Sequence, residues 1–377
     1  MEGRSLSLYI HIPFCIKKCA YCDFNSYTEK RLIPEYLKAL KKEMNNYKNL
    51  GCSIKTIYVG GGTPTILDEF QLEELFLNVK SAFNVEMGAE VTIEANPGTL
   101  SRDKLRVLKA LGVNRLSIGL QAYQPRLLKL LGRIHSIKDF EESYLEARNA
   151  GFENINVDVM FGLPEQSLKD FENTLRYLSL ISPEHISAYS LSVEEGTTFY
   201  NMYKRGELNL PDEQEERSMY HKAVDFLKAQ GYIHYEISNF AKPKRESRHN
   251  LTYWRNQEYL GLGAGSHSYF YGIRYSNVRH PSDYIRLLNQ NIRPVKQREI
   301  ITREEEIAEY CFLNLRLIQG LDREDFYRRF GVDIKQLYAT TIDELKEKGL
   351  LEENGIFIKL TPLGLDLANE VFMEFLP

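Results

Sequence analysis

The chain has 377 residues, of which 43% are hydrophobic and 27% charged, a composition typical of a globular protein with a sizeable core. Its formal net charge of −4 argues against non-specific nucleic-acid binding, which needs a basic surface. The first fifteen residues contain only a four-residue apolar run, too short for a signal peptide or a membrane span. We therefore expect a cytoplasmic protein whose five cysteines stay reduced and serve as ligands or core residues.

From the N-terminus to about residue 240, short β-rich runs alternate with longer helical patterns. The expected strands are 8–12, 56–59, 91–94, 115–118, 155–159 and 186–191. The expected helices are 34–47, 69–83, 102–110, two stretches that end near 150, 168–180 and 213–230. This alternation predicts a parallel sheet wrapped by helices, and six βα units suit a partial barrel better than a closed eightfold one. Reactive groups are expected at the carboxyl ends of the strands, where the βα loops gather.

The last part of the chain follows another pattern. A capping box that begins at Thr302, a turn signal at Asn354-Gly355 and a helix start at Thr361-Pro362 predict three helices, a hairpin and a final helix, as in a winged helix. Residues 301–377 carry 9 Lys and Arg against 16 Asp and Glu, which disfavours DNA binding and favours a lid or a partner-docking role. We therefore expect an α/β domain over 1–240, a connecting segment over 241–299 and a winged-helix-like α+β domain over 300–377.

Three of the five cysteines, Cys15, Cys19 and Cys22, fall within eight residues. A thiolate-rich group of this kind suits an iron–sulfur centre, whereas zinc normally takes four ligands. The alternative is that the three positions share one face of a helix and are simply buried, although Pro13 and the Lys17-Lys18 pair favour a loop. Three thiolates leave one iron of a four-iron cluster without a protein ligand, and such an open position admits a substrate or cofactor.

The remaining cysteines, Cys52 and Cys311, stand alone and are expected in the core. Gly60-Gly61-Gly62-Thr63 follows the second expected strand but lacks the pattern of a phosphate-binding loop, so ligand binding and a tight turn are equal alternatives.

Four polar residues, Glu94, Gln121, Asp158 and, further along, Arg133, fall at or beyond strand ends. Their convergence would form a polar small-molecule site, because carboxylates suit hydroxyl and amino groups and arginine suits a carboxylate.

The segment from His249 to Trp254 holds the only tryptophan of the chain beside a tyrosine and a histidine. These side chains could bind a flat macrocycle with the imidazole as axial iron ligand, but a buried aromatic pair is favoured when the residues alone are considered. His11, on the first strand, is expected to make structural hydrogen bonds. Residues 261–268 are expected to form a flexible loop able to close over the site.

The cysteine spacing, with an aromatic residue before the third cysteine, resembles the radical S-adenosylmethionine (SAM) superfamily. The longer string YIHIPFCIKKCAYCDFNSY resembles a narrower family, the oxygen-independent coproporphyrinogen III oxidases and their relatives, the HemW-type heme chaperones. GGGTPT, IEANPG, SIGLQAY, LLGRIHS, VDVMFGLP and GLGAGSHS are similar to motifs of that family in the same order. The resemblance covers nearly the whole chain and implies a partial (β/α)6 barrel of radical SAM type.

The resemblance implies that Cys15, Cys19 and Cys22 ligate a 4Fe–4S cluster and that S-adenosylmethionine binds beside it. The residues that would line the cofactor site are Tyr9, Tyr21, Gly61, Gly62, Thr63, Glu94, Gln121, Arg133 and Asp158. In this family the amino and carboxylate groups of the cofactor chelate the fourth iron, and one electron from the cluster cleaves the cofactor to methionine and a 5′-deoxyadenosyl radical. No catalytic residue beyond this set is assigned.

Two features bring the chain closer to the heme chaperones than to the oxidases. The oxidases have a fourth cysteine where this chain has Phe24, and a long N-terminal arm that we do not expect here, since the first cluster cysteine is already residue 15. HNLTYW resembles the HNxxYW motif of the chaperones and implies that His249 holds heme. The implied function is heme transfer to an acceptor hemoprotein, expected to be respiratory and possibly membrane-associated. The alternative is coproporphyrinogen III dehydrogenation to protoporphyrinogen IX. The family also allows a cluster-dependent dimer.

Overall fold

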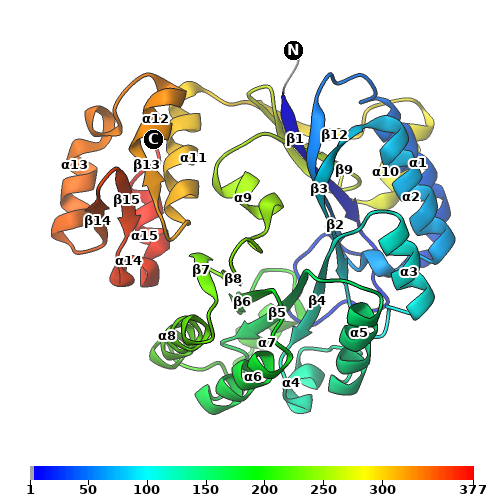
Figure 1. Cartoon of the computed structure of the whole chain (residues 1–377), viewed down its shortest axis with the longest axis horizontal. Coiled ribbons are helices and arrows are strands. Elements are labelled where there is room, and N and C mark those ends of the chain that lie inside the picture. Colours follow the sequence, from blue (N-terminus) through cyan, green and yellow to red (C-terminus); the bar gives the residue numbers. More distant parts are fainter. Residues whose placement is uncertain (1–3) are drawn as a thin grey trace.

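Six parallel strands, adjacent in the order in which they occur in the chain, form the centre of a curved sheet (Figure 1). The computed structural model describes residues 4–377. The strands are β1 (Ser5–Ile12), β2 (Ser53–Gly61), β3 (Asn84–Ala95), β4 (Arg115–Gln121), β5 (Ile155–Phe161) and β6 (His185–Ser190). The helices that follow them are α1 (Ile33–Asn45), α2 (Glu69–Ala82), α3 (Arg102–Ala110), α4 (Pro125–Leu130), α5 (Ile137–Asn149), α6 (Leu168–Ile181), α7 (Thr198–Lys204) and α8 (Glu213–Ala229). The predicted partial (β/α)6 barrel is confirmed.

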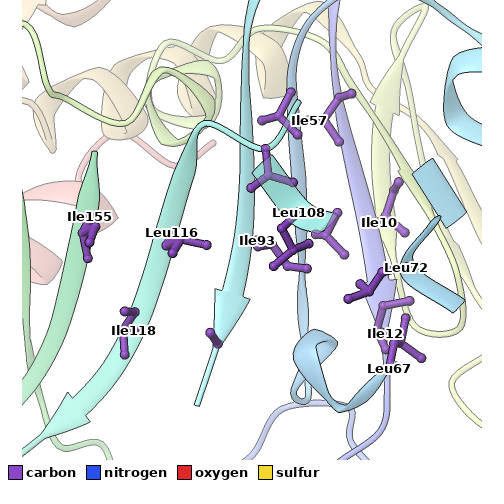
Figure 2. Packing of buried hydrophobic residues seen from close by; sticks show 14 of the residues in the cluster. Ile10, Ile12, Ile57, Leu67, Leu72, Ile93, Leu108, Leu116, Ile118 and Ile155 are labelled. Atoms are coloured by element: carbon purple, nitrogen blue, oxygen red, sulfur yellow. The ribbon is translucent and has the colours of Figure 1, made fainter. Parts of the chain in front are cut away.

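Branched apolar side chains of the strands fill the space between the sheet and its helices. Figure 2 shows Ile10 and Ile12 of β1 and Ile93 of β3 beside Leu72 of α2 and Leu108 of α3, and each of these side chains is fully buried. Apolar and polar residues alternate along the central strands, as in RLSIGLQ of β4 and INVDVMF of β5. One face of each strand therefore packs on the helices, and the other, with Ser117 and Asp158, lines the inside of the barrel. This packing holds the carboxyl ends of the six strands at one rim.

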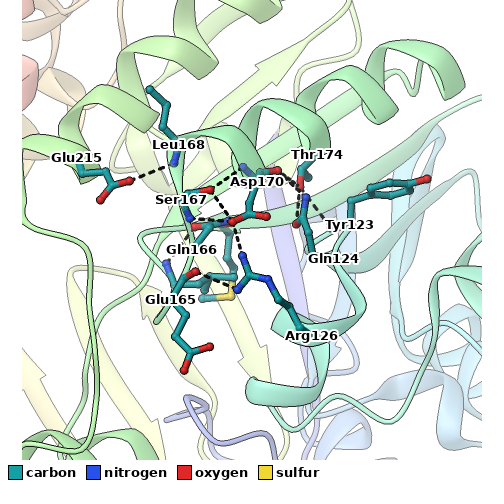
Figure 3. Close-up of polar contacts among 12 residues, drawn as sticks. Tyr123, Gln124, Arg126, Glu165, Gln166, Ser167, Leu168, Asp170, Thr174 and Glu215 are labelled. Carbon is teal, nitrogen blue, oxygen red and sulfur yellow. Dashed lines mark hydrogen bonds and ion pairs between the residues drawn. The ribbon is translucent and has the colours of Figure 1, made fainter.

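Polar contacts fix the chain segment that follows β4 (Figure 3). Ser167 and Asp170 form the capping box of α6, and Arg126 pairs with the same Asp170 while donating to the carbonyl of Glu165 over 2.9 Å. Gln124 donates to the carbonyl of Asp170 over 2.7 Å. These bonds hold the loop that begins directly after the last residue of β4 against the start of α6.

The segment from β7 to β12, which includes residues 241–299, extends the same sheet at both edges. The strands and helices of this region are β7 (Ile233–Glu236), β8 (Asn239–Ala241), α9 (Arg248–Trp254), β9 (Tyr259–Leu262), β10 (His267–Phe270), β11 (Ile273–Asn277), α10 (Pro281–Asn289) and β12 (Val295–Ile300). The sheet order is β12-β11-β10-β9-β1-β2-β3-β4-β5-β6-β8-β7, and β9 runs parallel to β1. The segment between β8 and β9, which contains α9, therefore crosses from the β6 side of the barrel to the β1 side.

The prediction of a flexible loop at residues 261–268 is wrong. The segment contains the end of β9, a tight turn centred on Ala264-Gly265 and the start of β10. The backbone N–H of Gly263 donates to Glu43 over 2.8 Å and that of Ala264 to the Tyr36 hydroxyl over 2.9 Å, both buried. A side chain at Gly263 would lie 2.5 Å from the carbonyl oxygen of His11, so the glycine serves close packing against β1.

The C-terminal residues form a small domain with its own core, as predicted. Its elements are α11 (Arg303–Leu315), β13 (Leu321–Asp322), α12 (Arg323–Phe330), α13 (Ile334–Glu347), β14 (Leu351–Asn354), β15 (Phe357–Leu360), α14 (Pro362–Asp366) and α15 (Ala368–Met373). The hairpin loop is Gly355-Ile356, one residue later than expected, because Gly355 takes the positive φ of a type II′ turn. The expected final helix is divided at Leu367.

This small domain lies beside α9 (Figure 1), with α11 in contact with α9. The backbone N–H of Ile237 donates to the carbonyl of Arg316 over 3.2 Å, and that of Ile318 to the carbonyl of Tyr235 over 3.1 Å. No helix in residues 4–377 is long and apolar enough to cross a membrane.

Candidate cluster and cofactor site

A cavity of about 340 Å³ opens at the carboxyl ends of the six central strands. Each of the strands β2 to β6, or the segment that follows it, contributes residues to the cavity wall, and the segment after β1 contributes the three clustered cysteines. The cavity therefore occupies the rim at which the sequence predicts that reactive groups gather.

The clustered cysteines lie in a loop and not on a helix, which excludes the alternative of a buried helix face. The loop is tied at its base, where the N–H of Cys15 donates to the carbonyl of Tyr27 over 2.9 Å and the N–H of Tyr27 to that of Pro13 over 2.8 Å. A tight turn brings the N–H of Cys22 to the carbonyl of Cys19 over 3.3 Å. All three thiols line the cavity, so the loop presents them to one space.

Burial raises the pKa of the Cys15 and Cys22 thiols, and this effect exceeds the opposing contribution of Lys18 to Cys22. The hydroxyl of Thr63 lies 3.5 Å from Sγ of Cys15, and Nη1 of Arg133 donates to Sγ of Cys19 over 3.6 Å. Within residues 4–377, no three His, Cys, Asp or Glu side chains surround one point as they would for a single metal ion. Thiolates that bind different irons of one cluster need not share such a point, so the donor set suits an iron–sulfur cluster.

Glu94 is the carboxylate at the end of β3. Its two oxygens accept hydrogen bonds from the Tyr58 hydroxyl over 2.8 Å and from the N–H of Gly61 over 3.0 Å. Burial, together with the charge of nearby Asp158, raises the pKa of Glu94 to about 7, although the two hydrogen bonds act in the opposite direction. A buried carboxyl held in this way can accept a hydrogen bond from a polar ligand.

Asp158, on β5, is the second carboxylate of the cavity wall. It accepts hydrogen bonds from Nδ2 of Asn156 over 2.7 Å and from the Ser117 hydroxyl over 3.0 Å. Burial raises the pKa of Asp158 despite these bonds. The carboxyl groups of Glu94 and Asp158 thus lie on the same cavity wall, and hydrogen bonds fix the orientation of each.

Arg133 is held by a short polar chain that links the cysteine loop to the strand ends. Its Nη2 donates to Asn96 over 2.5 Å and to the carbonyl of Gly119 over 3.2 Å, and Asn96 donates to the Thr63 hydroxyl over 2.7 Å. Its Nε is buried and has no hydrogen-bond partner within residues 4–377. An arginine with an unused buried donor at the cavity wall can bind an anionic group of a ligand.

The glycine run after β2 allows this strand to approach the cysteine loop. A Cβ on Gly62 would lie 2.6 Å from the carbonyl oxygen of Phe14, and one on Gly61 would lie 2.6 Å from the ring of His11. The N–H of Gly62 donates to the carbonyl of Ile12 over 2.9 Å and that of Thr63 to the carbonyl of Phe14 over 2.8 Å. The run is thus a packing site and a part of the cavity wall at once.

Eight of the nine expected cofactor residues and all three cysteines line this cavity, namely Tyr21, Gly61, Gly62, Thr63, Glu94, Gln121, Arg133, Asp158, Cys15, Cys19 and Cys22. The exception, Tyr9, lies on an adjoining cavity of about 670 Å³ that shares Gly61 and Glu94 with the first. Tyr58, Asn96 and Ser117 also contribute, and sequence reasoning missed them. Asn96 and Ser117 lie inside the IEANPG and SIGLQAY motifs, which could have indicated them.

His249 lines neither cavity. It is 1% exposed, its Nδ1 lies 2.8 Å from the Thr56 hydroxyl, and its Nε2 lies 2.9 Å from the Tyr253 hydroxyl. Its ring stacks on Tyr58 with centroids 5.1 Å apart. Burial lowers the pKa of His249 to about 3, so the imidazole is neutral at neutral pH. His11 makes structural hydrogen bonds, as expected, to Tyr9 and to the carbonyl of Asn25, each over 2.8 Å.

Comparison with known proteins agrees with these features. Residues 9–178 match the Radical SAM superfamily, and residues 301–367 match the HemN C-terminal domain. The chain is 44% identical to heme chaperone HemW of Bacillus subtilis (strain 168), over 98% of this chain and 99% of that protein, and 34% identical to heme chaperone HemW of Escherichia coli (strain K12), over 98% of each. The structure is similar to that of coproporphyrinogen III oxidase (HemN) from Escherichia coli, with a TM-score of 0.87, 25% identity, and coverage of 99% of this chain and 90% of that one.

Proposed function

Because this chain belongs to the family of HemW-type heme chaperones, within the radical SAM superfamily, we propose that it holds a 4Fe–4S cluster and S-adenosylmethionine and passes heme to an acceptor hemoprotein. The observation that carries the proposal is the common cavity at the strand ends, which is lined by three thiols, by the partly buried carboxylates of Glu94 and Asp158, and by an arginine. We place the protein in the cytoplasm, where these thiols stay reduced.

The residues of the cavity match the groups that they would hold. Cys15, Cys19 and Cys22 would bind three irons and leave the fourth open. Glu94 and Asp158 are partly buried acceptors suited to hydroxyl and amino groups, and Arg133 is suited to a carboxylate. When bound, the cluster and cofactor together supply one-electron chemistry. The chain itself orients these groups and shields them from water inside the barrel.

A second function, coproporphyrinogen III dehydrogenation, is favoured by the likeness to HemN over 99% of the chain. Phe24 stands against it, because this position carries a fourth cysteine in the oxidases that the sequence resembles. The Phe24 side chain is 63% exposed and lines the cavity, so an apolar group occupies the place where the oxidases offer a thiol.

Anaerobic reconstitution with iron and sulfide, followed by S-adenosylmethionine, a reductant and coproporphyrinogen III, separates the two functions. We expect no catalytic formation of protoporphyrinogen, while heme added to the same preparation binds to the chain. Protoporphyrinogen in more than one turnover would overturn the chaperone assignment. A chain that neither turns over coproporphyrinogen III nor binds heme would exclude both functions.

A further inference from the structure

The histidines of the chain differ sharply in their access to a ligand. All eight lie within residues 4–377, and five of them, His11, His135, His185, His234 and His249, are at most 6% exposed. Of the other three, His221 is bound to Asp366 on the far side of α8, and His280 caps α10 through Nδ1 and lies near Glu29. His267 is exposed, and its ring makes no hydrogen bond or ion pair with any residue of the described chain.

His267 is the first residue of β10 and lines the second cavity, the one of about 670 Å³. This volume lies in the range of roughly 300–1,000 Å³ that is usual for cofactor and ligand sites. The second cavity shares Asp23, Phe24, Gly61 and Glu94 with the cluster cavity, so a ligand in it would lie directly beside the proposed cofactor.

The wall of the second cavity combines aromatic rings with free cations. Tyr253 and Tyr259 pack edge to face with centroids 4.7 Å apart, and exposed Phe24 completes an apolar border. Arg279 and Lys296 also line the cavity, and neither side chain forms an ion pair within residues 4–377. Asp23 and Glu94, which line both cavities, are the acidic groups at the border between them. Aromatic walls suit a planar macrocycle, and unpaired cations suit its carboxylates.

The surroundings of His267 favour the neutral form of its imidazole. Partial burial lowers the pKa of His267, and the guanidinium groups of Arg274 and Arg279 lower it further. Arg274 is itself engaged by Glu309 through two short bonds of 2.5 and 2.6 Å, whereas Arg279 is not. A neutral ring offers a nitrogen lone pair to a metal, which a protonated ring cannot do.

His249 reaches the second cavity only through another side chain. Tyr253, one turn later on α9, lines the cavity, and its hydroxyl lies 2.9 Å from Nε2 of His249. The other ring nitrogen is held by Thr56 on β2. His249 is therefore placed to orient Tyr253, and it has no free nitrogen to bind an iron atom.

We propose that the second cavity is the heme site, that His267 supplies the axial ligand to the heme iron, and that Arg279 and Lys296 bind the heme propionates. This inference rests on the proposed function, since it names the site at which the chaperone holds its cargo. His249 then acts as a positioning residue through Tyr253, which makes the HNLTYW segment a support of the site and not its iron-binding group.

The test is a spectroscopic heme titration of the full chain, in which His267→Ala, His249→Ala and the control His221→Ala, a half-buried histidine that lines neither cavity, are compared with wild type. Imidazole ligation is followed by the Soret band and by electron paramagnetic resonance. We expect His267→Ala to weaken heme binding by about tenfold or more and to lose the imidazole signature, which free imidazole restores. His249→Ala should keep that signature, and His221→Ala should match wild type.

The inference is overturned if His267→Ala keeps both its affinity and its imidazole signature, or if His249→Ala alone loses the signature in a folded chain. A double variant, Arg279→Gln with Lys296→Gln, tests the propionate contacts independently. This double variant should weaken the binding of heme more than the binding of heme dimethyl ester, whose carboxylates are blocked. If wild-type protein binds no heme at all, the proposed function is rejected. If heme binding is the same with and without His267, only the assignment of the heme site is rejected.

Discussion

Nε2 of His249 lies 2.9 Å from the hydroxyl oxygen of Tyr253, and of these two residues only the tyrosine lines the cavity beside the cluster site. The pair is separated by four positions on α9, so that both side chains lie on one face of the helix. The buried imidazole holds the Tyr253 hydroxyl in place through this hydrogen bond. Within the HNLTYW segment, the histidine is buried and the tyrosine lines the cavity.

The first prediction concerns this pair. His249→Ala should lower the free energy of unfolding by about 2–4 kcal/mol, because it leaves a cavity in the barrel and removes the hydrogen-bond partner of Tyr253. Tyr253→Phe keeps the ring and should cost about 1 kcal/mol. Urea unfolding of both variants measures these values. A His249→Ala chain as stable as wild type would show that the imidazole is not the structural support described above.

The second prediction concerns the pH dependence of stability. The pKa of Glu94 is about 7 in the folded chain and about 4.5 when unfolded, so between these values the folded state binds more protons than the unfolded one. The stabilising contribution of Glu94 to the folded state is therefore fully present below pH 4.5 and is lost as the pH rises through 7. The free energy of unfolding of Glu94→Gln, relative to that of wild type, should therefore rise by about 2 kcal/mol from pH 5.5 to pH 8. The measurement is urea unfolding of both ligand-free proteins at the two values, and an equal difference at both would contradict the assignment.

The third prediction tests the cluster ligands. Cys19→Ala should assemble almost no iron–sulfur cluster after anaerobic reconstitution, because one of three protein ligands is missing. The matched control is Cys52→Ala, whose half-buried thiol bonds only to the carbonyl of Leu50, at 3.6 Å. Iron and sulfide analysis with visible absorbance reports the result. Full cluster content in Cys19→Ala, or equal loss in both variants, would remove Cys19 from the ligand set.

The fourth prediction tests the contact between the glycine run and the cysteine loop. Gly62→Ala places a methyl group 2.6 Å from the Phe14 carbonyl oxygen, directly before Cys15, and should cost about 1–3 kcal/mol and reduce cluster assembly. Gly51→Ala is the control, since its Cβ meets no atom within 4 Å and only the positive φ of 68° is strained. The measurement is the cluster yield per folded chain of both variants. Equal yields would show that the glycine run does not affect cluster assembly.

Local patterns were sufficient to predict the barrel. The alternation of short β-rich runs with longer helical patterns predicted the six central strands and the helices that follow them. The cysteine loop was also predictable, since Pro13 and two lysines oppose a buried helix face. These features depend on residues close together in the sequence, which is why a single chain reveals them.

Long-range pairing was not predictable in this way. Nothing in residues 259–262 indicates that they pair with β1, about 250 positions earlier, and this pairing creates the second cavity. The burial of His249 follows from the same crossing of α9 through the barrel. The three glycines before His267 predicted a flexible loop, whereas close packing explains two of them, since Gly263 approaches the His11 carbonyl of β1 and Gly265 approaches the Asn25 side chain.

Heme transfer tests the central claim most directly. The reconstituted chain, loaded with one equivalent of heme, is mixed anaerobically with a heme-free respiratory cytochrome, and the absorbance of the cytochrome is followed with and without S-adenosylmethionine. The account predicts that heme leaves the chain and that the cytochrome gains its native spectrum faster than with the same concentration of free heme. If the chain keeps its heme, or delivers it no faster than free heme does, then this protein is not a heme chaperone.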